Sequence, residues 1–130
     1  MPAENYSFDV WAEKKWNPSG LLIEQGGIYE FRTEVLEDLS DASIPCTPDG
    51  FDSVNILMTL TEWLRRAPSD KWFCLMGTQN FKMTTAFTIG SARRDYKANH
   101  SGELMCFVND VSGFYFNNKG RISVTVIRIE

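Results

Sequence analysis

Two segments far apart in the chain alternate apolar and polar residues with a period of two. Residues 6–12 place Tyr6, Phe8 and Val10 on one face, and residues 122–126 repeat the pattern. Successive side chains of a β-strand point to opposite faces, so this period indicates strands with one buried face. A chain bounded by such segments has to build a sheet and cover one side of it.

Further strand signals lie between these two segments. Four short segments are apolar or alternate between apolar and polar residues, namely 28–32, 71–78, 84–90 and 102–108. Gly, Asn and Pro residues separate these segments. The acidic, turn-rich residues 33–51 predict a long loop. Many short strands with almost no helix favour an all-β fold, a β-sandwich rather than an α/β sheet.

One segment, residues 55–66, breaks the strand pattern. Its apolar residues recur at helical spacing and form a single stripe, and they are Ile56, Leu57, Leu60, Trp63 and Leu64. Asp52 or Ser53 is a suitable N-cap, and Pro68 ends the helix. We expect one short helix that lies over a sheet edge or the mouth of the sandwich, with Trp63 and Trp72 in the core.

Length and charge limit the classes of protein. The chain has 130 residues, which fits a single domain over residues 1–130. Its net charge of -4 argues against nucleic acid or an anionic membrane as partner.

No apolar run of about 18 residues and no signal peptide is seen, which predicts a cytoplasmic protein and leaves non-classical export open. Cys46, Cys74 and Cys106 lack CxxC spacing and are expected to be reduced and buried.

The segment from Asn109 to Gly120 gathers oxygen-bearing side chains. Asp110, Asn117 and Asn118 offer hard donors of the kind that Ca²⁺ prefers, and the segment has no thiolate or imidazole for softer metals. The same residues are also turn formers, so a wide hairpin connection without metal explains them equally simply. A second acidic loop, with Glu37, Asp38, Asp41 and Asp49, can add charge if the fold brings it near.

This segment resembles the loop of a known family. The pattern Asn-Asp-x-x-Gly-x-Tyr-x-Asn-Asn-x-Gly, complete from Asn109 to Gly120, is similar to that of the PA-IL-like bacterial lectins, which are calcium-dependent, galactose-specific and galactose-binding-domain-like. The resemblance implies a jelly-roll β-sandwich. It also implies calcium held by the side chains of Asp110, Asn117 and Asn118 and by backbone carbonyls at Phe114 and near Leu39, with the sugar contacting Asp110, Val111 and Asn117.

The sequence departs from that family at two places. The His and Gln that bond the galactose of those lectins are replaced by residues 51–55 (FDSVN), and their disulfide has no counterpart.

A lone His100 and the lack of a carboxylate pair, P-loop or HExxH motif argue against an enzyme.

Two hypotheses follow for the function. The first is a non-catalytic, calcium-dependent carbohydrate-binding protein that holds its sugar through residues 109–120. The alternative is a structural or protein-interaction β-sandwich module that has lost sugar binding. A homo-oligomer is compatible with either hypothesis, because multivalency makes weak sugar sites useful.

Overall fold

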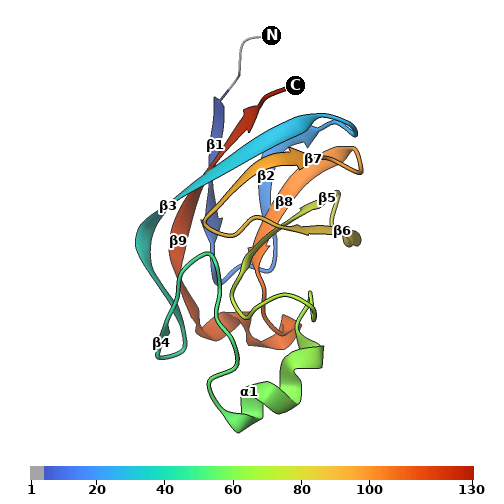
Figure 1. Ribbon diagram of the computed structural model, residues 1–130. Coiled ribbons are helices and arrows are strands. Elements are labelled where there is room, and N and C mark those ends of the chain that lie inside the picture. The colour runs from blue at the N-terminus through green and yellow to red at the C-terminus, as the bar shows by residue number, and fades with distance from the viewer. Residues whose placement is uncertain (1–4) are drawn as a thin grey trace.

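The computed structural model describes residues 5–130 as two antiparallel sheets packed face to face (Figure 1). The first sheet holds β1 (Asn5–Trp11), β9 (Asn118–Arg128), β3 (Ile28–Asp41), β4 (Ile44–Pro45) and β7 (Ala92–Lys97). The second holds β2 (Asn17–Ile23), β8 (Gly102–Val108), β5 (Leu75–Gln79) and β6 (Lys82–Thr88).

The strand order is that of a jelly roll. β1, β9, β3 and β7 are neighbours in one sheet, and β2, β8, β5 and β6 are neighbours in the other. Several strands that follow each other along the chain, such as β1 and β2 or β8 and β9, therefore lie in opposite sheets, whereas β5 and β6 form a hairpin within one sheet. The predicted all-β sandwich with one short helix is confirmed.

The core between the sheets is built from alternate residues of the strands. Val10, Ile122 and Val124 face it from the first sheet, and Leu104 and Val108 face it from the second, all without exposed surface. The alternation at residues 122–126 marks the buried face as predicted, whereas in residues 6–12 Val10 is buried, Phe8 is half-buried and Tyr6 is 38% exposed.

The predicted loop over residues 33–51 is wrong in its first half. β3 continues through this segment and pairs with β9 as far as Asp41 opposite Asn118. Glu34, Glu37 and Asp38 of this segment are exposed, and Glu37 forms an ion pair with Arg121. The strand is specified by its ladder with β9, because its own side chains carry little apolar alternation.

The helical segment begins and ends near the predicted residues but is not buried. α1 (Ile56–Thr61) is followed by a 3₁₀ turn, η1 (Glu62–Leu64), and Asn55 caps α1 in place of Asp52 or Ser53. No residue of either element is buried. Trp72 is 4% exposed, as expected for the core, whereas Trp63 is 71% exposed, so its predicted place in the core is wrong.

Three connections meet at one end of the sandwich. α1, the turn between β3 and β4, and the 3₁₀ segment η2 (Ser112–Asn117) lie together there, at the end opposite to the chain termini (Figure 1).

The three cysteines are free, with Cys46 half-buried. Within residues 5–130 no helix has the length and apolarity to cross a bilayer.

Gly120 permits the close approach of β9 to β3 beside this end. Its φ is +110°, and a Cβ there would lie 2.6 Å from the carbonyl oxygen of Asp38 and 2.8 Å from the Cα of Leu39. Those neighbours are backbone atoms and cannot move without disturbing the ladder.

We expect Gly120→Ala to lower the free energy of unfolding by about 2–4 kcal/mol, since strain and overlap add. Gly113→Ala is the matched control, because no atom lies within 4 Å of a Cβ at Gly113. Urea denaturation of both variants measures the difference. Equal stability of the two variants would contradict this account of Gly120.

Candidate cation-binding site

Asp110 is held in place by its neighbour in the chain. The buried side chain of Asn109 accepts a hydrogen bond from the amide of Ala67 at 2.9 Å and donates to the carbonyls of Ala67 and Lys71 at 2.9 and 3.0 Å. The carbonyl of Asp110 accepts from the amide of Arg66 at 3.0 Å. The segment after α1 therefore fixes the backbone on which the Asp110 carboxylate stands.

A second anchor ties η2 to the sheet. The hydroxyl of Tyr115 donates to the carbonyl of Val108 and accepts from Nη1 of Arg66 at 3.0 Å. The guanidinium of Arg66 lies 3.8 Å from the ring centroid of Phe107 and 4.4 Å from that of Trp16. Such cation–π contacts hold the arginine over the second sheet and, through Tyr115, hold η2.

The end of β3 completes the site from the other side. Asp41 is buried and pairs with Asn118 in the ladder, and the amide of Ala42 donates to the carbonyl of Asn117 at 2.9 Å. These two contacts place Asp41 beside η2, although about 70 residues separate them in sequence.

Of the acidic residues expected as a second source of charge, Asp41 joins the site. Glu37 instead forms an ion pair with Arg121, and Asp49 accepts a hydrogen bond from Ser91.

Three buried oxygen atoms at this site have no hydrogen-bond partner among the described residues. They are Oδ2 of Asp110, Oδ1 of Asn117 and Oδ1 of Asn118. The Nδ2 of Asn118 donates to the carbonyl of Ala12 at 3.2 Å, and the other oxygen of Asp110 accepts from the amide of Val111 at 2.7 Å. All three orphan atoms are acceptors. A cation is the ligand that satisfies several acceptors at once.

The electrostatics of the site also favour a cation. Burial raises the pKa of Asp110 to about 6, with the negative charge of Asp41 adding to the effect and the amide of Val111 and the side chain of Asn118 opposing it. Burial likewise raises the pKa of Asp41 above 3.8. Neither carboxylate forms an ion pair with a Lys, Arg or His in the described part of the chain. Two desolvated carboxylates that repel each other would both gain from a positive ion.

A pocket of about 380 Å³ opens over these groups. Four of the residues proposed from the sequence line it together with Asp41, and they are Asp110, Val111, Phe114 and Asn117. Asn118 is buried directly behind this lining through its pairing with Asp41. The opposite wall is apolar and comes from α1, η1 and the loop before β5, with the side chains Leu57, Met58, Leu64 and Trp72.

Leu39 lies outside this pocket. Its side chain is in the core, and its carbonyl accepts a hydrogen bond from the amide of Cys46 at 2.9 Å. Asp41, two residues further along β3, lines the pocket instead. The sequence marked Asp41 as one of four acidic candidates, and only the β3–β9 register distinguishes it from the others.

The donor set differs from that of a transition-metal centre. Within residues 5–130 no group of three or more His, Cys, Asp or Glu side chains is placed to hold a metal ion. The site instead combines two carboxylates with amide oxygens. A set composed of oxygen atoms suits a hard divalent cation such as Ca²⁺.

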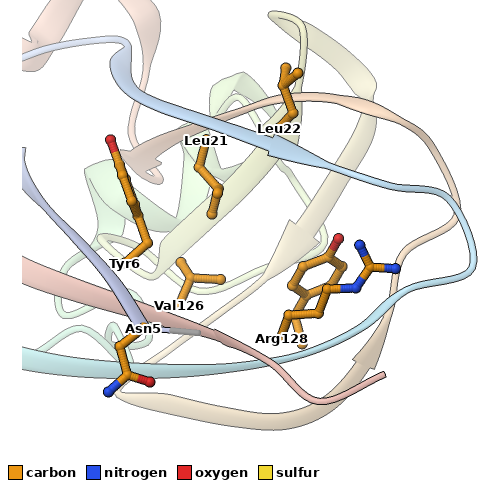
Figure 2. A pocket seen from close by; sticks show the side chains of 7 residues that line it. Asn5, Tyr6, Leu21, Leu22, Val126 and Arg128 are labelled. Atoms are coloured by element: carbon orange, nitrogen blue, oxygen red, sulfur yellow. The ribbon is translucent and has the colours of Figure 1, made fainter. Parts of the chain in front are cut away.

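A second, smaller pocket lies at the other end of the sandwich (Figure 2). Figure 2 shows Tyr6 and Arg128 on either side of Leu21 and Val126. The hydroxyl of Tyr6 donates to the carbonyl of Ser19, and Arg128 forms an ion pair with Glu24. The hydroxyl of Tyr6 and the guanidinium of Arg128 therefore already have partners within the protein. Unlike the orphan oxygen atoms of the first pocket, they do not call for a ligand.

The strand order and the packing of the two sheets define the class of this protein as a jelly-roll β-sandwich. A solved structure described as "EclA N-terminal domain; PllA-like lectin" matches with a TM-score of 0.67 and 18% identity over 95% of each chain. No family model matches the chain, and the search of curated proteins finds no match either. At this identity the likeness shows the fold.

Asp110→Asn should stabilise the metal-free protein at pH 7 by about 1–3 kcal/mol, because it removes a buried charge and adds a donor beside two orphan acceptors. The pKa of Asp110 is 3.8 as the ordinary value and about 6 in the folded protein. Between pH 3.8 and pH 6 the folded state therefore binds more protons than the unfolded state. The wild-type protein gains stability as the pH falls through this range. The advantage of the variant should therefore shrink from pH 7 to pH 4.5.

Thermal unfolding in chelator at both pH values measures this difference. Asp38→Asn is the control, because Asp38 is an exposed carboxylate on the same strand as Asp41. A destabilised Asp110→Asn variant at pH 7 would mean that the carboxylate serves the fold and not a cation.

Proposed function

We propose that this protein is a non-catalytic, calcium-dependent carbohydrate-binding protein. Asp110, Asn117 and Asn118 would hold the ion with their side chains, Phe114 with its backbone carbonyl, and Asp41 would supply the second negative charge. The observation that carries the proposal is the set of three buried oxygen acceptors without a hydrogen-bond partner, of which those of Asp110 and Asn117 belong to residues that line the pocket. No other position in the described chain combines buried carboxylates with orphan amide oxygens.

The choice of calcium rests on donor chemistry. Carboxylate and amide oxygens are hard ligands, and Ca²⁺ accepts six to eight of them in flexible geometry. Cys46 lies near both carboxylates, but burial raises the pKa of its thiol to about 11, with the charges of Asp41 and Asp110 adding to the effect. At neutral pH this sulfur is a protonated thiol and a poor ligand for a soft metal.

The carbohydrate half of the proposal rests on the open side of the site. Asp41, Asp110, Phe114 and Asn117, four of the five residues that would hold the ion, line the pocket, so a ligand in the pocket would lie next to the ion. Two neighbouring sugar hydroxyls can replace two waters there, and Asp110, Val111 and Asn117 line the position where such a sugar would lie. The structural neighbour, itself described as a lectin, supports this assignment.

Calcium should raise the melting temperature of the wild-type protein. A ligand that binds only the native state adds about 2.7 kcal/mol of stability at a hundred times its dissociation constant. Differential scanning calorimetry with CaCl₂, MgCl₂ or chelator measures the shift, and Asp110→Asn should abolish it while Asp38→Asn keeps it. An unchanged wild-type melting temperature at millimolar calcium would refute the metal site.

A glycan array should show binding in calcium that disappears in chelator. Asp110→Asn should give a blank array, and Asp38→Asn should bind as the wild type does. If calcium stabilises the protein but the array stays blank, the alternative of a protein-interaction module takes precedence, because the cation would then support the loop alone.

A further inference from the structure

The helical segment beside the candidate cation site is unusual for its exposure. α1 has the sequence ILMTLT without a charged residue, and neither α1 nor η1 has a buried side chain. Leu57 and Leu60 are 69% and 67% exposed. A helix this short is not stable by itself in water and normally depends on packing of its apolar face. In this structure that face is turned outward.

Part of this exposed surface belongs to the pocket. Leu57 and Met58 of α1, Leu64 of η1 and Phe114 of η2 line the same cavity as Asp110. We call these four side chains the apolar wall. Any molecule that reaches the carboxylates from outside must therefore pass over or lie against them.

Charged side chains next to the apolar wall are engaged elsewhere. The carboxylate of Glu62 accepts a hydrogen bond from the hydroxyl of Ser53, and the guanidinium of Arg65 lies 5.0 Å from the ring centroid of Trp72 and donates to the carbonyl of Pro68 at 2.7 Å. The polar residues Asn55 and Thr61 of the same helical segment also line the pocket, but their side chains bond backbone groups of α1. The ionic groups of the pocket are Asp41 and Asp110.

We propose that the ligand of this site is an alkyl glycoside, whose sugar hydroxyls bind at the cation while its aliphatic aglycone lies on the apolar wall. This inference rests on the proposed function, since it names the chemical class of the sugar ligand. One molecule with a polar and an aliphatic end contacts both the carboxylate side of the pocket and its apolar wall.

Two other occupants fit the surface less well. A second copy of the chain would cover a concave wall and would bury the carboxylates of Asp41 and Asp110 without a partner, which is costly. An aromatic aglycone has only Phe114 to stack on, because Trp72, the other aromatic side chain of the pocket, is 4% exposed and the remaining side chains of the apolar wall are aliphatic. Leucine and methionine side chains adapt well to an aliphatic chain.

The test compares methyl and hexyl glycosides of galactose, fucose, mannose and glucose by isothermal titration calorimetry, in calcium and in chelator. Each buried methylene is worth about fourfold in affinity, so the hexyl form of the bound sugar should bind at least tenfold tighter than the methyl form. 1-Hexanol alone should not bind. The gain should require calcium.

Two leucines of the same helix provide a matched pair of variants. Leu57 lines the pocket and Leu60 does not, at almost equal exposure. Leu57→Gln should reduce the hexyl gain to within threefold, and Leu60→Gln should keep it. Both substitutions replace an exposed leucine, so thermal unfolding should show the same stability for the two variants.

The outcomes separate this inference from the proposed function. Methyl and hexyl glycosides that bind equally in calcium would overturn the inference and leave carbohydrate binding intact. A hexyl gain that persists in chelator or in Leu57→Gln would also overturn it. If no glycoside of either kind binds in calcium, the proposed function and the inference both fail.

Discussion

The antiparallel pairing of β3 with β9 is the constraint on which the candidate site depends. The ladder runs from Tyr29 opposite Arg128 to Asp41 opposite Asn118, so the end of one strand meets the start of the other at the pocket. A slip of one residue would turn Asp41 away from the pocket and Ile122 away from the core. Because burial of Ile122, Val124 and Val126 specifies the register, the hydrophobic core also positions the polar site.

The site itself opposes folding. Buried acceptors without donors cost free energy, and two desolvated carboxylates add repulsion. The surrounding structure offsets this cost with satisfied polar anchors, because Asn109 bonds three backbone positions and Tyr115 joins Arg66 to Val108. Well-bonded neighbours around unsatisfied groups are expected where a ligand supplies the missing interaction, since local violations of folding rules gather at functional sites.

Local patterns predicted what local interactions determine. The alternation at residues 122–126 can be recognised from neighbouring letters, and its apolar residues are buried as predicted. The oxygen-bearing residues Asp110, Asn117 and Asn118 can be recognised in the same way, and their role as cation ligands stays a prediction. β3 beyond residue 33 and β7 were missed because their pairing partners are distant; in β7 the one buried residue is Tyr96. Asp41 could not be singled out for the same reason. The helix was found, but Trp63 of its stripe was assigned to the core, since periodicity does not distinguish an apolar face that packs against the protein from one that is exposed.

Two departures from ordinary globular structure meet in one pocket. Exposed apolar surface on α1 and unpartnered polar atoms beneath η2 are each unfavourable in water, and they arise from segments about 50 residues apart in the chain. A protein–protein interface would cover the leucines but leave the oxygen atoms unsatisfied, and a bare cation would satisfy the oxygen atoms but leave the leucines in water. An amphiphilic ligand on a bound cation relieves both at once, because its hydroxyls and its aliphatic part lie only a few bonds apart. The proximity of the two defects is therefore stronger evidence for a small amphiphile than either defect is alone.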